Sequence, residues 1–157
     1  MVLSLFSMLE ESAEDIVEDL RNGTYRVSYT ANISGSYSMS VTLNRAHIAG
    51  SPFNLNVDTD QTRPEYCVAE GAGLYAAEAG KATSFTIYKR DRQGNPRTRG
   101  VDHFYIDVQG AGNIECKIRD ERDGSYTVTY TAKHAGAYRF DVGLAPNKGP
   151  IARSPFA

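Results

Sequence analysis

Apolar and polar residues alternate along two stretches of the chain that are nearly the same sequence. They cover residues 19–41 and 120–142, and about half of their aligned positions are identical. Each contains a tight-turn dipeptide, Asn22-Gly23 or Asp123-Gly124, and continues as an alternating Tyr-x-Val-x-Tyr segment. A Gly-x-Tyr then opens a second alternating segment. Because a period of two is typical of β-strands, each copy predicts two strands joined by a short connection.

The spacing of the two copies predicts the class of the folded unit. The period is about 100 residues, which is too long for a solenoid repeat and close to one immunoglobulin-like β-sandwich. Tyr37 and Tyr138 take the place of the tyrosine that, in antibody domains, precedes a disulfide cysteine by two residues. Met39 and Phe140 stand where that cysteine would be. We therefore predict an all-β, immunoglobulin-like β-sandwich that is held together by apolar packing alone.

Comparison of the two copies also predicts the domain organisation. Residues 1–57 hold the C-terminal strands of one sandwich, ending with Phe53–Val57, and the polar stretch 58–65 is the expected linker. Residues 66–157 form a second sandwich that lacks most of its last strand. The chain is thus expected to contain one nearly complete repeat preceded by part of another.

Residues 1–18 have two interpretations. Their apolar residues recur three and four positions apart with acidic residues between them, which predicts an amphipathic helix. Alignment of the two copies instead predicts a strand near Ile16–Asp19. The residues themselves leave both interpretations open.

Two more alternating segments predict neighbouring strands at one side of the second sandwich, in positions C and D of an immunoglobulin fold. Apolar residues alternate with Tyr105 and Asp107 in the first segment, and with Glu115 and Lys117 in the second. The apolar positions are Phe104, Ile106 and Val108 in strand C, and Ile114, Cys116 and Ile118 in strand D.

The two copies share a longer series of motifs. Asp-x-x-(Asn/Asp)-Gly-(Thr/Ser)-Tyr-x-Val-x-Tyr is followed in both by Gly-x-Tyr and by Ile-Ala-x-Ser-Pro-Phe. Together with Gly71–Leu74 and Gly80–Ile87, this series resembles the filamin-type immunoglobulin repeat of the filamin/ABP280 repeat family, over nearly all of residues 16–157. The resemblance implies a non-enzymatic structural or interaction module of a scaffold or actin-crosslinking rod. It implies that actin is contacted only indirectly, through a parent protein.

The resemblance also implies a peptide-docking edge, since several filamin-type repeats bind partner tails as an extra strand along strand C and against strand D. Other repeats are the second kind of protein partner that it implies. The candidate groove consists of Phe104, Tyr105, Ile106, Asp107, Val108 and Gln109 as the backbone template, and Ile114, Cys116 and Ile118 as the apolar wall.

Two residues of strand C depart from the family pattern. Peptide-binding members tend to have small outward residues there, whereas Tyr105 and Asp107 either block an added strand or select an unusual one. The alternative is that the apolar residues of strands C and D only fill the core, while Asp107 and Lys117 protect the edge.

Composition places the chain among ordinary globular sequences, with 157 residues, a formal net charge of -2 and 41% hydrophobic residues. No apolar run is long enough to span a bilayer, so no membrane insertion is expected. Cys67 and Cys116 form no Cys-x-x-Cys pair, which favours a reducing compartment such as the cytoplasm. An extracellular adhesion module is the alternative, because Asn22-Gly-Thr24 and Asn32-Ile-Ser34 are glycosylation acceptors in a secreted chain.

No catalytic, cofactor or metal site is expected. The three histidines lie in different segments without ligand spacing, and no serine has the setting of a nucleophile. A basic loop over Lys89–Arg99 is expected to be solvated. Because Asp91 and Asp102 dilute its charge and no aromatic residue is interleaved for base stacking, no nucleic-acid binding is expected.

Overall fold

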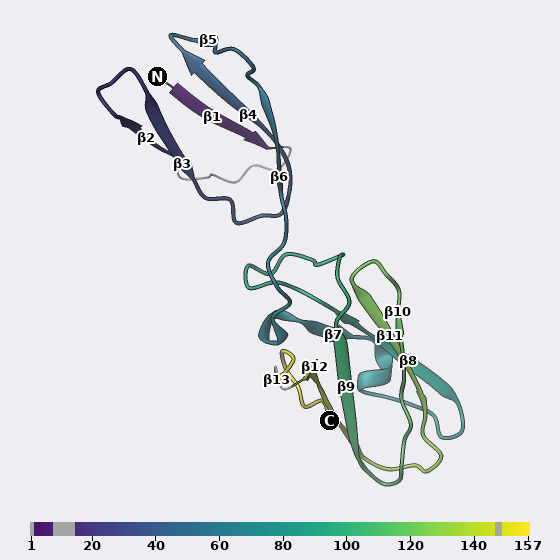
Figure 1. The fold of residues 1–157 in the computed structure, drawn as a ribbon. Helices are drawn as coiled ribbons and strands as arrows, with labels where there is room; N and C mark the ends of the chain where they lie inside the picture. Colours follow the sequence, from purple (N-terminus) through teal and green to yellow (C-terminus); the bar gives the residue numbers. More distant parts are fainter. Residues whose placement is uncertain (1, 8–14, 147–148) are drawn as a thin grey trace. The chain divides into compact units, whose positions relative to one another are not determined.

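The protein is built from β-strands (Figure 1). The computed structural model describes residues 2–7, 15–146 and 149–157. Within these ranges the only helical segments are two single turns of 3-10 helix, η1 (Pro64–Tyr66) and η2 (Ala72–Leu74). The expected all-β class is therefore confirmed.

The unit Asp60–Ala157 contains two antiparallel sheets. One has the strand order β10-β11-β8-β7 and the other has the order β13-β12-β9 (Figure 1). The strands are β7 (Val68–Glu70), β8 (Ala82–Tyr88), β9 (His103–Gly110), β10 (Lys117–Asp120), β11 (Ser125–Thr131), β12 (Tyr138–Ala145) and β13 (Gly149–Pro150). The strands at positions C and D, β9 and β10, thus each lie at the end of their sheet, as in an immunoglobulin-like sandwich.

One hydrophobic core joins the two sheets, because every second side chain of their central strands points inward. Phe85 and Phe140 pack edge to face across the core, with their ring centroids 6.0 Å apart. The fully buried side chains of the core include Phe85 and Ile87 of β8, Val128 of β11, and Val142 and Leu144 of β12.

The two repeated tyrosines have the same role in both units. The hydroxyl of Tyr138 donates a hydrogen bond to the backbone carbonyl of His134 at 2.9 Å, and that of Tyr37 donates to the carbonyl of Ile33 at 2.6 Å. Each tyrosine therefore ties the start of its strand to the preceding loop. Both cysteines are free thiols, so no disulfide takes part in this packing.

The unit Met1–Thr59 repeats the second half of this arrangement. Its strands are β1 (Val2–Ser7), β2 (Asp15–Asp19), β3 (Tyr25–Tyr29), β4 (Gly35–Leu43), β5 (Ala46–His47) and β6 (Phe53–Val57). β2 pairs with β3 as β10 pairs with β11, and β4 pairs with β6. β1 lies beside β4 as β9 lies beside β12, since Ser7 is opposite Tyr37 and Gly110 is opposite Tyr138. This unit therefore has a strand at position C that comparison of the copies did not predict.

The helix interpretation of residues 1–18 is wrong for the described part of that stretch. Val2–Ser7 and Asp15–Asp19 are both strands, and the remaining residues, 8–14, lie outside the described ranges. The alignment of the copies was the better guide, because pairing of Asp15–Asp19 with Tyr25–Tyr29 outweighs the local helical spacing of apolar residues.

Strand D begins later than the alternation of apolar residues indicates. β10 covers only Lys117–Asp120, because its pairing with β11 starts at Lys117 opposite Thr129. Ile114 and Cys116 lie before the strand, yet both are half-buried and pack against the core. The alternation of Ile114 and Cys116 with polar residues therefore reflects burial of the connection between β9 and β10. It does not mark residues that pair with a neighbouring strand.

Candidate functional site

The outer edge of β9 is the candidate functional site. β9 is the last strand of the order β13-β12-β9, and no strand among the described residues pairs with its other side. An edge of this kind presents backbone donors and acceptors to solvent, and it can receive an added strand.

The register of β12 shows which residues of β9 present these backbone groups. Phe140 exchanges both of its backbone hydrogen bonds with Phe156, at 2.8 and 2.9 Å, and it therefore faces away from β9. Val108, directly opposite Phe140, must then point its N–H and C=O toward the outer edge, because paired positions alternate in an antiparallel ladder. Phe104 and Ile106 follow by the same period of two.

The inward side chains of these three residues are held by the core. Phe104 is buried and stacks edge to face on Tyr126, with ring centroids 5.0 Å apart. Ile106 and Val108 are half-buried and pack against the same cluster. The edge is therefore a rigid template, since the side chains that carry its backbone groups are anchored in the sandwich.

Tyr105 does not cover the outer edge. Its ring lies across Gly143 of β12, the residue directly opposite, so closely that a Cβ built on that glycine would collide with the ring. An aromatic ring over a cross-strand glycine is a stable pairing in β-sheets. Because the ring leans toward β12, the side of β9 that faces away from β12 stays open.

Asp107 gives the outward face of β9 its charge. The Gln109 amide donates a hydrogen bond to this carboxylate at 3.4 Å, whereas the carboxylate of the opposite residue, Asp141, pairs with Arg139 at 3.2 Å. Asp107 thus remains an exposed anion beside the edge.

The predicted apolar wall consists of two half-buried side chains and one exposed side chain. Ile114 and Cys116 pack against the core, but Ile118 is 39% exposed. Ile118 lies opposite the fully buried Val128, so it faces the core side of β10. It remains exposed there because β10 is the end strand of its sheet. An apolar side chain is thus available on the strand D side.

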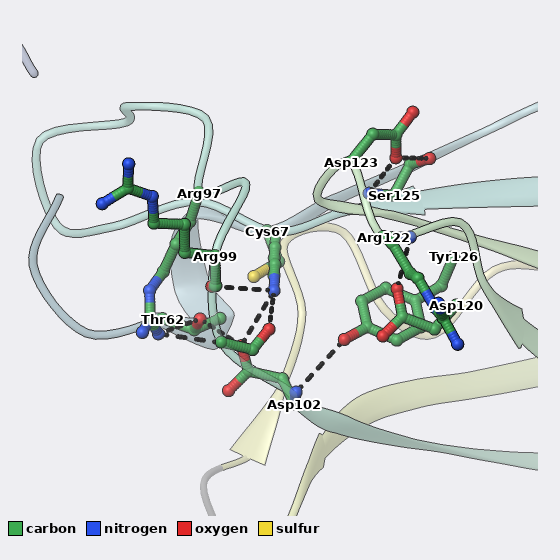
Figure 2. A network of polar contacts seen from close by, with 12 residues as sticks. Thr62, Cys67, Arg97, Arg99, Asp102, Asp120, Arg122, Asp123, Ser125 and Tyr126 are labelled. Carbon is green, nitrogen blue, oxygen red and sulfur yellow. Dashed lines mark hydrogen bonds and ion pairs between the residues drawn. The ribbon is translucent and has the colours of Figure 1, made fainter. Parts of the chain in front are cut away.

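A buried polar network holds the segment that enters β9. Lys89 is only 2% exposed, and its ammonium lies 3.6 Å from the carboxylate of Asp102. The Thr62 hydroxyl donates a hydrogen bond to the same carboxylate at 2.7 Å, and the backbone N–H of Asp102 donates to the hydroxyl of Tyr126 at 3.1 Å (Figure 2). The Arg97 guanidinium donates to Thr62 at 2.9 Å. These contacts hold Asp102, the residue immediately before β9, in place.

The prediction that the basic loop is exposed to solvent is wrong for two of its cations, Lys89 and Arg97. Lys89 is buried, where it also donates hydrogen bonds to the carbonyls of Arg99 and Gly100, and Arg97 is mostly buried. Arg92 is the kind of residue the sequence led us to expect, with a side chain that is 63% exposed. Lys89 and Arg97 are buried because they gain partners from other segments on folding. Asp102 neutralises Lys89, and Thr62 accepts a hydrogen bond from Arg97.

The register makes a direct prediction for backbone dynamics. In hydrogen–deuterium exchange the amides of Phe104, Ile106 and Val108 are expected to exchange at least about tenfold faster than the amides of their alternating neighbours, Tyr105 and Asp107. The neighbours are bonded to β12, whereas the three edge amides face solvent. Uniform exchange along β9 would contradict the assigned edge.

Burial of the two thiols predicts a fall in stability at alkaline pH. Burial raises the pKa of Cys67 and of Cys116 from 9.0 to about 11. Below pH 9 both thiols are neutral in the folded and the unfolded chain, so stability is unaffected. Between pH 9 and 11 the unfolded chain loses these protons first, and the free energy of unfolding is expected to decrease.

Urea unfolding at pH 8, 9, 10 and 11 measures this decrease. In a double variant, Cys67→Ala with Cys116→Ala, the slope with pH should be shallower. The double variant should still lose some stability at alkaline pH, because burial also raises the pKa values of Tyr126 and Tyr130. An unchanged slope in the double variant would show that the thiols are not the cause.

Neither a metal site nor a membrane-spanning helix is found in the described part of the chain. No three His, Cys, Asp or Glu side chains there are grouped so that they could hold a metal ion. No helix in those ranges has the length and apolar character required to cross a membrane.

Comparison with known proteins matches both units to one family. The model of the Filamin/ABP280 repeat matches residues 6–54 and 61–157. Filamin-A of Drosophila melanogaster is 31% identical over 151 residues, which is 96% of this chain and 6% of that protein. E3 ubiquitin-protein ligase TRIM45 of Mus musculus is 34% identical over 86 residues, which is 52% of this chain and 15% of that protein. The chain thus spans only a small part of the length of these curated relatives.

Solved structures show the same fold at low sequence identity. The Escherichia coli adhesin FdeC superposes with a TM-score of 0.66 at 20% identity, covering 99% of this chain and 50% of that one. The Lin-41 filamin domain superposes with a TM-score of 0.51 at 14% identity, covering 61% of this chain and 92% of that one. Since the family model covers nearly the whole sequence, the chain belongs to the Filamin/ABP280 repeat family.

Proposed function

We propose that this chain is a non-enzymatic interaction module of a scaffold or actin-crosslinking rod, and that it binds extended peptides along the outer edge of β9. The observation that carries the proposal is the set of backbone groups that Phe104, Ile106 and Val108 direct toward solvent. Such groups supply the affinity when a peptide joins a sheet as an additional strand. Family membership supports a role in protein binding. Contact with the actin cytoskeleton would be made by other parts of a parent protein.

The side chains beside the edge define the peptide that fits. In a strand added to β9, every second side chain points inward, toward Ile114, Cys116 and Ile118. The intervening side chains point outward, and one of them lies beside the exposed carboxylate of Asp107. The preferred peptide therefore alternates aliphatic residues with polar ones, and carries Lys or Arg next to Asp107.

A peptide of alternating valine and lysine tests the docking edge. Its affinity for the 157-residue protein is measured by titration calorimetry with two variants of one residue. Val108→Pro removes the N–H that is directed to the peptide, whereas Val108→Ala removes side-chain volume and keeps that N–H. Val108→Pro is expected to bind at least about tenfold more weakly than Val108→Ala, because one backbone bond is lost and the ring crowds the edge. Equal affinities would overturn docking at this edge.

Ile118 tests the apolar wall separately. Ile118→Glu is expected to abolish binding of the same peptide, since a carboxylate would replace an apolar contact surface. Ile118→Val is the matched control and should bind almost as the unaltered protein does. The fold should survive both changes because the side chain is 39% exposed. Binding of Ile118→Glu at unaltered affinity would remove the wall from the groove.

An extracellular adhesion module is the second candidate function. It is favoured by the exposed acceptor triplet Asn22-Gly-Thr24 in the turn between β2 and β3. A loss of mass after glycosidase treatment of native material would support this candidate. An unmodified Asn22 and Asn32 would support the cytoskeletal setting instead.

A further inference from the structure

A polar pocket lies on the sheet β10-β11-β8-β7, at the point where β10 begins beside β11 (Figure 1). Its volume is about 490 Å³, which is within the range of roughly 300–1,000 Å³ that is typical of ligand sites. All of its lining residues belong to the Asp60–Ala157 unit, and none of them is part of the candidate groove beside β9. The polar residues among them are Asn113, Glu115, Lys117, Thr129, Thr131 and Lys133.

The pairing of β10 with β11 explains why hydroxyl and ammonium groups gather here. Thr129 and Thr131 alternate with buried residues of β11, so their side chains project from the outer face of the sheet. Lys117 is directly opposite Thr129, and side chains of directly opposite residues project from the same face. Lys133 follows two residues after Thr131 and lines the same pocket. Two cations and two hydroxyls thus border one concave site.

The late start of β10 also leaves backbone groups of β11 directed at the pocket. The N–H of Glu121 donates to the carbonyl of Ser125 at 3.1 Å, so Lys117 and Thr129, which follow by the same period of two, form a hydrogen-bonded pair. Thr131, two residues further on, must then point its N–H and C=O to the same side. No described residue before Lys117 pairs with β11 there. A backbone donor therefore joins the side-chain donors of the pocket.

The charged groups of the pocket are not neutralised by the protein. Arg119, the next outward cation of β10, pairs with Glu121 at 2.7 Å. By contrast, Lys117, Lys133 and Glu115 form no ion pair within the described part of the chain. The two ammonium groups are therefore available to an anion, and the carboxylate is available to a hydrogen-bond donor.

We propose that this pocket binds a phosphorylated polyol of about the size of a hexose phosphate. The phosphate lies between Lys117 and Lys133, and it accepts hydrogen bonds from both ammonium groups and from the hydroxyls of Thr129 and Thr131. A hydroxyl of the polyol donates to the carboxylate of Glu115, whereas a bare anion would only be repelled by that carboxylate. A free sugar phosphate and the headgroup of a phosphoinositide share this chemistry.

Glucose 6-phosphate is the probe for the cations of the site. It is titrated into the 157-residue protein while backbone amide resonances are followed by NMR, and the amide of Thr131 is expected to shift. Lys117→Gln and Lys133→Gln should each weaken binding at least about fivefold, because each variant removes a charge-assisted hydrogen bond. Arg139→Gln is the matched control, since it removes one positive charge from the other sheet. Equal binding by all three variants, or no binding by the unaltered protein, would overturn the proposal.

Inorganic phosphate and glucose test the two parts of the ligand separately. Glucose 6-phosphate should bind at least about fivefold more tightly than inorganic phosphate. Glu115→Ala should remove most of that advantage, because it removes the acceptor for the polyol hydroxyl. Equal affinity of the unaltered protein for the two phosphates would indicate an adventitious ion only. Binding of glucose as tight as that of glucose 6-phosphate would exclude a role for the phosphate. Either result would overturn the proposal.

Vesicles distinguish the two sources of the ligand. The protein is sedimented with phosphatidylcholine vesicles that either contain or lack phosphatidylinositol 4-phosphate. Sedimentation that requires the phosphoinositide and is abolished by Lys117→Gln would support a lipid headgroup as the ligand. Absence of sedimentation, together with binding of glucose 6-phosphate, would support a free sugar phosphate.

One further variant separates this pocket from the proposed docking edge. Val108→Pro removes a backbone donor from the edge of β9 and should bind glucose 6-phosphate as the unaltered protein does. Loss of binding in this variant would assign the probe to the β9 edge and overturn the proposal. Because the pocket and the edge use different residues, failure of peptide docking would leave the expected binding of the sugar phosphate unchanged.

Discussion

Replacement of Phe85 by alanine is expected to lower the free energy of unfolding of the Asp60–Ala157 unit by about 3–5 kcal/mol. The side chain is 2% exposed and lies at the centre of β8, where its ring packs against that of Phe140 at 6.0 Å. Alanine would remove this contact and leave a cavity between the two sheets, because neighbouring strands cannot close the space without losing their pairing.

Urea unfolding monitored by tyrosine fluorescence measures this loss. Lys81→Ala is the control, since its side chain lies just before β8, is 69% exposed and forms only a surface ion pair with Glu78. The control is expected to change stability by less than about 0.5 kcal/mol. A loss below about 1 kcal/mol for Phe85→Ala would contradict the position of Phe85 in the core.

Replacement of Asp102 by alanine is expected to cost a similar amount, about 3–5 kcal/mol, for an electrostatic reason. Lys89 would remain 2% exposed with carbonyl oxygens as its hydrogen-bond acceptors but without its carboxylate partner. The Thr62 hydroxyl would lose its acceptor at the same time. An uncompensated buried charge is more costly than the loss of the pair as a whole.

A double variant separates these two contributions. Adding Lys89→Met to Asp102→Ala removes the stranded charge, keeps most of the apolar volume and preserves contact with the Tyr126 ring, over which the ammonium now lies at 5.7 Å. The double variant is expected to recover a large part of the lost stability, as measured by urea unfolding. Without recovery, desolvation of Lys89 would not be the source of the loss.

The same network connects stability with the candidate site. Asp102 immediately precedes β9, and its backbone N–H is bonded to the hydroxyl of Tyr126 in β11. Loosening of this contact should therefore increase exchange at the start of β9 before it affects Val108 at the other end. The docking edge thus depends on a polar cluster that is itself not part of the edge.

The strand that carries the candidate site could be predicted from the sequence. Phe104, Ile106 and Val108 alternate with polar positions, and a period of two assigns one face to the core. Alternation could not predict that the Tyr105 ring leans on Gly143, because these residues are far apart in the chain and are brought together by pairing of β9 with β12. The edge is open because β9 is the end strand of its sheet, and this contact keeps the Tyr105 ring away from it.

The burial of the charged residues, in contrast, could not be predicted from the sequence. Lys89 and Arg97 have the local sequence of an exposed loop, and nothing within that loop indicates burial. Their partners, Asp102 and Thr62, become neighbours only when the segment before β7 folds against the loop that enters β9. Sequence reasoning therefore missed a network whose signal is a set of charges and hydroxyls distributed over separate segments.

The sequence by itself determined the all-β class, the repeat, the turns and the inward faces of the main strands, because these depend on local turn chemistry and on a period of two. Only the tertiary structure decided that the outer edge of β9 remains open and which cations are buried. These features arise from pairing between distant segments. An open edge or a neutralised charge is defined by the neighbours that a residue acquires on folding, and local sequence does not specify them.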